Sequence, residues 1–243
     1  MPRPNRGAII FSRIYNQFSR RYPDISLSLT ELYAAEQPGA IARGLVDLAL
    51  GAGATSSEIT DIPIAHEELL VSLPASHPLA KQETIHLADL RDTPFVLQGP
   101  RHSIRLIAEQ LFQQAGFQPV VAFESNDVIL LDSMMHQAVG VGLVSNAHVF
   151  PCSELAYRPL NPPVHQTLHL RFPLGHTLTE PERYLAGLLI TERLRDPRYK
   201  PTDDPLVDQL LQEVLSPLSA GRHRQPAPGG SGHRPADHAG GEP

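Results

Sequence analysis

The chain has 243 residues, 41% of them hydrophobic and 19% charged, which is enough to bury a core in one domain or two modest lobes. Its formal net charge of −6 argues against a nucleic-acid binder that works through a basic face, because phosphate contacts need clustered Lys and Arg. Cys152 is the single cysteine, so no internal disulfide can form. With no secretory signal pattern and no window near the roughly 18 apolar residues that span a bilayer, we expect a cytoplasmic protein without membrane contact.

The first third of the chain alternates helical and extended patterns. Residues 8–22 carry apolar side chains on one helical face and predict an amphipathic helix. In residues 25–32 the period changes to two, as in a strand with one apolar face. A short helix is expected near residues 40–43, then a buried strand over residues 46–53 and another extended stretch over residues 61–73.

The middle of the chain repeats this order. Strands are predicted over residues 94–99, 119–125 and 141–145, with helices over residues 104–116 and 128–140 between them. Such alternation implies an α/β fold with a largely parallel sheet. The helix that opens the chain is out of order, since an α/β sheet normally pairs its first helix with a preceding strand.

Three helix starts carry capping signals. Ser103 precedes the helix of residues 104–116, and Asp127 precedes the next helix. Late in the chain, after an extended stretch over residues 167–172, Thr179 and Glu182 form a capping-box pattern ahead of a further helix.

The composition changes near Asp196. Residues 196–243 are rich in Pro, Gly, Arg and His and are predicted to form a tail. Leucines and a valine at helical spacing predict a short helix near residues 205–218, resting on the main body or serving as a partner motif. Beyond Ser219 almost nothing apolar is available to bury, and disorder is expected.

No catalytic signature is present, so no enzyme activity, cofactor or metal site is predicted. His165 and His169 have ligand-like spacing only on a helix, whereas their segment reads as a strand, where such positions lie some 13 Å apart. Cys152 has no evident base beside it in the sequence and is interpreted as a structural or incidental cysteine rather than a nucleophile.

The loops at strand ends are better candidates for binding. In open α/β sheets, ligands bind outside the carboxyl ends of the strands, where helix N-termini present free amide groups to anions. These loops are residues 31–38, 51–57, 98–105 and 124–128. Arg101, His102, Ser103 and Arg105 lie at a predicted helix N-terminus and could receive a carboxylate. Alternatively, Ser103 only caps the helix and the arginines are solvated.

The order of motifs resembles the effector-binding domain of LysR-type transcriptional regulators. The resemblance covers residues 6–195 and rests on segments that are weak singly but specific in this order. They are FSRRYPDISLSLTEL, EQPGAIARGLVDLAL, IPIAHEELLVSLPASHPLA, IHLADLRDTPFVL, LFQQAGFQPVVAFES and HQAVGVGLVS.

The resemblance implies a two-lobed fold like that of type 2 periplasmic binding proteins, with a small ligand in the cleft. Lobe one would comprise residues 1–66 and 166–195, and lobe two residues 67–165. Two crossover strands, residues 63–74 and the stretch around residues 162–170, would join them and act as hinges.

Three departures from the family pattern stand out. The helix-turn-helix and linker helix that precede this domain in the family do not occur in the sequence. The first strand of lobe one, expected before Arg6, is also not found, which suggests a truncated regulator. Ala34 and Ala35 replace a hydroxyl-bearing position of some relatives, and Ala52 falls near an arginine used by others.

The resemblance implies a sensor of a small organic effector, for which an anionic group is one option. Such a sensor would form a homo-oligomer and reach DNA only through a helix-turn-helix outside this sequence. Alternatives are a solute-binding protein, an enzyme on the same scaffold, or a regulator remnant that dimerises with intact paralogues. The predicted effector-binding residues are Ala34, Gln37, Gly51, Ala52, Arg101, His102, Ser103 and Asn126.

Overall fold

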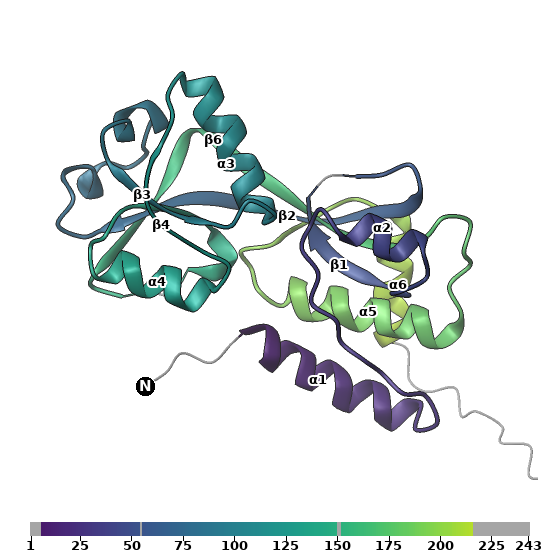
Figure 1. Ribbon diagram of the computed structural model, residues 1–243. Helices are drawn as coiled ribbons and strands as arrows, with labels where there is room; N and C mark the ends of the chain where they lie inside the picture. The colour runs from purple at the N-terminus through teal and green to yellow at the C-terminus, as the bar shows by residue number, and fades with distance from the viewer. Residues whose placement is uncertain (1–5, 54, 150–151, 216–243) are drawn as a thin grey trace, which may run out of the picture.

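A computed structural model describes residues 6–53, 55–149 and 152–215, which form two α/β lobes joined by two long strands (Figure 1). The helices are α1 (Arg6–Arg21), α2 (Gln37–Ala42), α3 (Ser103–Ala115), α4 (Val128–His136), α5 (Glu180–Leu194) and α6 (Pro205–Leu215), with 3₁₀ turns η1 (Pro78–Lys81), η2 (Leu87–Leu90) and η3 (Asn146–His148). The strands are β1 (Ala49–Ala52), β2 (Ile59–Pro74), β3 (Pro94–Gln98), β4 (Val120–Ser125), β5 (Gly142–Ser145), β6 (Leu155–Pro173) and β7 (Lys200–Pro201).

The main sheet is antiparallel, with the order β1-β6-β2-β5 and β7 paired to β2. Among the described residues, parallel pairing is limited to β3 with β4 and to two isolated bridges, Phe95 with Val141 and Ile85 with Leu160. The prediction of a largely parallel sheet is therefore wrong. The reason is that β2 and β6 run side by side in opposite directions through both lobes (Figure 1). The predicted division between the lobes falls where Glu67 pairs with Gln166.

Each lobe has its own apolar core. In lobe two, α3 packs on β3 and buries an aromatic cluster in which the rings of Phe95 and Phe112 lie 4.9 Å apart. In lobe one, α5 packs against the sheet and buries Leu170 and Ile190. α1 lies along α5, as its apolar face predicts, and buries Phe18 (Figure 1). Fully burying a side chain of this size contributes about 1.5–3 kcal/mol.

The capping predictions have mixed outcomes. The Asp127 carboxylate accepts backbone N–H groups of the first turn of α4, and the Thr179–Glu182 capping box is formed, so both predictions are confirmed. The prediction for Ser103 is wrong, because α3 begins at Ser103 itself and its N-cap residue is His102, which makes no side-chain capping bond.

The predicted strand over residues 25–32 does not form. Among the described residues, the backbone from Ser26 to Leu32 finds no hydrogen-bonding partner, and Leu29 is 60% exposed. β1 is likewise bonded only along one edge, to β6. An alternating segment becomes a strand only beside another strand. Residues 27–32 and β1 instead line opposite sides of a pocket. The family resemblance expects the first strand of lobe one in this space.

The start of the predicted tail belongs to lobe one. Tyr199 and Leu210 are buried in the lobe-one core, and β7 pairs with β2. α6 packs closely on α5, where a Cβ on Gly187 would lie 2.4 Å from the carbonyl oxygen of Leu210. The helix predicted near residues 205–218 is thus found as α6, resting on the main body. The disorder predicted beyond Ser219 lies outside the described residues.

Candidate functional site

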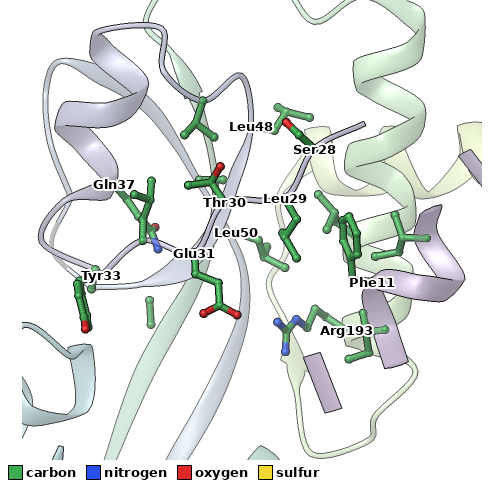
Figure 2. A pocket seen from close by; sticks show the side chains of 18 of the residues that line it. Phe11, Ser28, Leu29, Thr30, Glu31, Tyr33, Gln37, Leu48, Leu50 and Arg193 are labelled. Carbon is green, nitrogen blue, oxygen red and sulfur yellow. The ribbon is translucent and has the colours of Figure 1, made fainter. Parts of the chain in front are cut away.

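A pocket of about 830 Å³ lies between the lobes and continues into lobe one (Figure 2). Six of the eight predicted effector-binding residues line it, three from each lobe, and they come from four separate loops, whereas Gly51 and Arg101 are not among the lining residues. Those that line the pocket are Ala34, Gln37, Ala52, His102, Ser103 and Asn126.

Gln37 is held in place by a buried arginine that sequence reasoning missed. Arg171 of β6 is fully buried, and its guanidinium donates to Gln37 Oε1 at 2.8 Å, to Asp61 Oδ1 at 3.1 Å and to the Gly53 carbonyl oxygen at 3.1 Å. Gly51 lies directly under the Gln37 amide, since a Cβ there would be 2.5 Å from Gln37 Nε2. Gly51 therefore shapes the pocket floor by its lack of a side chain.

The wall from lobe two is built on the N-terminus of α3 and the loop after β4. Burial lowers the pKa of His102, so its imidazole is neutral at pH 7 and offers hydrogen bonds rather than charge. Asn126 lies against Gly99, where a Cβ would meet Asn126 Oδ1 at 2.2 Å. The side chain of His102 does not cap α3, so the first-turn amide groups receive no acceptor from that residue, and both His102 and Ser103 line the pocket.

Arg101 lies beside the pocket wall and bridges the lobes. Its Nη1 is 2.5 Å from Glu36 Oε1, and its guanidinium carbon lies 4.0 Å from the centre of the Tyr33 ring. The Tyr33 ring in turn meets the His102 ring edge-on, with centroids 5.9 Å apart. Arg101 thus links the loop before α3 to the loop before α2, next to the pocket residues Tyr33 and His102.

The half of the pocket that enters lobe one is largely apolar and was not predicted. Figure 2 shows Leu29, Leu50 and Phe11 on this side, with the carboxylate of Glu31 and the guanidinium of Arg193 at its edge. These residues come from four different segments of the chain, so no local pattern marked them as neighbours. The expected strand over residues 25–32 would have used Leu29 for sheet packing.

The remaining candidates are placed apart from the pocket. His165 and His169 lie on β6, as the extended pattern predicted, and His165 is exposed. Burial lowers the pKa of His169, although Asp61 3.9 Å away acts to raise it. Cys152 does have a base nearby, because His136 approaches it from α4. Within the described residues, no helix is both long and apolar enough to cross a bilayer.

The fold and the pocket between two lobes define a ligand-binding domain of the periplasmic-binding-protein type. Residues 6–192 match the LysR substrate binding domain, and the chain belongs to that family. The predicted family and fold class are thereby confirmed.

Regulators of this family are similar to the chain in sequence. The transcriptional dual regulator GltC of Bacillus subtilis strain 168 is 33% identical over 154 residues, which cover 58% of this chain and 51% of GltC. A probable RuBisCO transcriptional regulator of Trichormus variabilis is 27% identical over 150 residues, covering 59% of this chain and 44% of the relative. The chain spans about half the length of the curated relatives it matches.

Solved structures agree with the fold. The regulatory domain of Synechocystis PCC6803 CcmR in complex with 2-PG superposes with a TM-score of 0.66 at 19% identity, covering 76% of this chain and 92% of that domain. The effector-binding domain of QuiR in complex with shikimate gives 0.62 at 18% identity, with 76% and 90% covered. A BenM variant domain gives 0.65 at 22% identity, with 80% and 93% covered.

Proposed function

We propose that this chain is the small-molecule sensing part of a LysR-type transcriptional regulator and not an enzyme. The observation that carries the proposal is the convergence of six predicted residues from four loops on one pocket between the lobes. The bound ligands named for the CcmR and QuiR domains support a small organic effector here as well. In the whole regulator, which we place in the cytoplasm, homo-oligomerisation and a helix-turn-helix would convert occupancy into DNA binding.

An anionic effector fits the wall from lobe two. The N-terminus of α3 presents backbone amide groups and the positive end of the helix dipole near His102 and Ser103. Arg101 supplies a guanidinium beside the pocket residue Tyr33, and an anionic effector would compete with Glu36 for it. Such competition would change the contact between the lobes, which is how a ligand shifts a two-state equilibrium.

The test is a thermal-shift screen of the full chain with a panel of small carboxylic and phosphorylated acids. A ligand at 100 times its Kd adds about 2.7 kcal/mol to the free energy of unfolding. We expect Ser103→Ala and Asn126→Ala to reduce the shift given by a hit, and Arg101→Ala to reduce it for acids but not for their uncharged amides. Ser133→Ala, an exposed serine on α4, is the matched control. A hit whose shift is unchanged in all three pocket variants would refute this site.

A further inference from the structure

Three potential metal ligands meet on lobe two, away from the pocket. His136, Cys152 and Glu154 each place one ligand atom within 4.8 Å of the others. His136 ends α4, whereas Cys152 and Glu154 lie in the segment that leads into β6. α4 begins just after the pocket residue Asn126 and ends at His136. Its nine residues are about 12 Å long, so the cluster lies about 12 Å from the end of α4 that is near the pocket.

A hydrogen bond holds His136 in the tautomer with its hydrogen on Nδ1, which is the tautomer required for metal binding through Nε2. Its Nδ1 lies 2.8 Å from the carbonyl oxygen of Asp132 and 3.5 Å from the Asp132 carboxylate. A carbonyl oxygen can only accept a hydrogen bond, so Nδ1 carries the hydrogen and donates it. The lone pair then resides on Nε2. A carbonyl or carboxylate behind the other ring nitrogen is the usual outer support of a metal-binding histidine.

The donor set selects one class of metal ion. A thiolate and an imidazole favour Zn²⁺ and similar transition ions, whereas Mg²⁺ and Ca²⁺ prefer oxygen ligands throughout. Metal–ligand bonds of about 2.0–2.3 Å put tetrahedral ligand atoms about 3.5 Å apart, so the three groups must approach by about 1 Å. Glu154 is exposed and Cys152 is half-buried and not in a disulfide, which leaves their side chains room to rotate.

We propose that His136, Cys152 and Glu154 bind a Zn²⁺-class divalent transition-metal ion, with the fourth coordination position taken by water or another small ligand. The ion would tie the end of α4 to the segment that enters the crossover strand β6. The sequence alone did not suggest this site, because the histidine lies on a different element from the Cys-Ser-Glu stretch and has no motif-like spacing from it.

Cobalt(II) gives a specific test, because Co²⁺–thiolate bonds absorb in the near ultraviolet. Cys152 is the only cysteine of the chain, so a thiolate band reports this site even though the chain has 12 histidines that could bind cobalt elsewhere. We expect reduced full chain titrated with Co²⁺ to develop the band to one equivalent, and Zn²⁺ to abolish it by displacement. Cys152→Ser should lose the band, and His136→Ala and Glu154→Gln should weaken cobalt binding at least about tenfold.

His165→Ala is the matched control, since it removes an exposed histidine of β6 outside the cluster and should leave the titration unchanged. Far-UV circular dichroism of each variant separates loss of the site from loss of folding, and His136→Ala keeps the test valid if Cys152→Ser does not fold. The proposal is overturned if reduced chain shows no thiolate band with excess Co²⁺. It is equally overturned if folded His136→Ala and Glu154→Gln bind Co²⁺ as tightly as the parent chain.

Discussion

Replacing Arg171 by methionine tests whether the buried guanidinium organises the pocket floor. Arg171 is 0% exposed and donates to Asp61, to Gln37 and to the carbonyl oxygen of Gly53. Methionine fills similar space but donates nothing. The Asp61 side chain is 8% exposed, and its Oδ2 already has no hydrogen-bond partner among the described residues. The substitution therefore leaves a buried carboxylate without its cation.

The expected loss follows from these contacts. Breaking a buried ion pair by removing one partner costs about 3–5 kcal/mol, because the remaining charge stays desolvated. The hydrogen bonds from the guanidinium to Gln37 and to the Gly53 carbonyl oxygen are lost as well, and the packing of methionine in the same space offsets this further loss. We expect Arg171→Met to lower the free energy of unfolding by about 3–5 kcal/mol, out of about 5–15 for a domain. The corresponding drop in Tm is about 10 °C.

Urea unfolding followed by far-UV circular dichroism measures this loss, since the chain has no tryptophan for fluorescence. Arg158→Met on the same strand is the control, because the Arg158 side chain donates to the carbonyl oxygen of the adjacent Tyr157 and its loss should cost less than about 1 kcal/mol. The double variant Asp61→Leu with Arg171→Met should recover much of the loss. A loss below about 1 kcal/mol for Arg171→Met, or no recovery in the double variant, would refute the reasoning.

Three further predictions concern the lobe contact, pH and the open edge of β1. Glu36→Gln should change the free energy of unfolding by less than about 1 kcal/mol, because the Glu36–Arg101 pair is half exposed. The same substitution should raise the affinity for an acidic effector, because it frees Arg101. Unchanged affinity in a calorimetric titration would contradict the proposed competition between Glu36 and the effector. Burial lowers the pKa of His169 in the folded state, so the unfolded state binds the proton first, and the free energy of unfolding should fall as the pH drops below about 6.5. The urea concentration at the midpoint of unfolding should fall over the same pH range, and His169→Gln should reduce this dependence on pH. An alternating apolar strand added before α1 should pair with the free edge of β1 and raise the free energy of unfolding by several kcal/mol. A Gly-Ser extension of equal length should have no effect. Equal melting curves for the two extended chains would show that β1 does not accept another strand.

Much of the local structure follows from the sequence because its causes are local. The period of apolar residues predicted the helices, and Asp127 and the Thr179–Glu182 pair marked two helix starts correctly. Ser103 was misjudged by one position, since a serine can open a helix as its first residue as well as cap it. The loops of the pocket could be named because they follow predicted strands, and ligands of α/β sheets bind beyond the strand ends.

What failed depended on partners far away in the sequence. The alternation in residues 25–32 is a strand pattern, but a strand needs a hydrogen-bonded neighbour, and the described residues supply none there. The apolar residues of α6 predicted a helix but not its place, which the close approach of Gly187 on α5 allows.

By itself, the sequence determined the family, the helices and most of the strands in their order, and the loops that carry the pocket residues, because each depends on spacing along the chain. Only the tertiary structure decided that the two long strands pair in opposite directions, that Arg171 reaches Gln37 across 134 positions, and that His136 meets Cys152. These three features depend on distances in space between distant segments, and a hydrogen bond or a metal site is set by such distances rather than by separation in sequence.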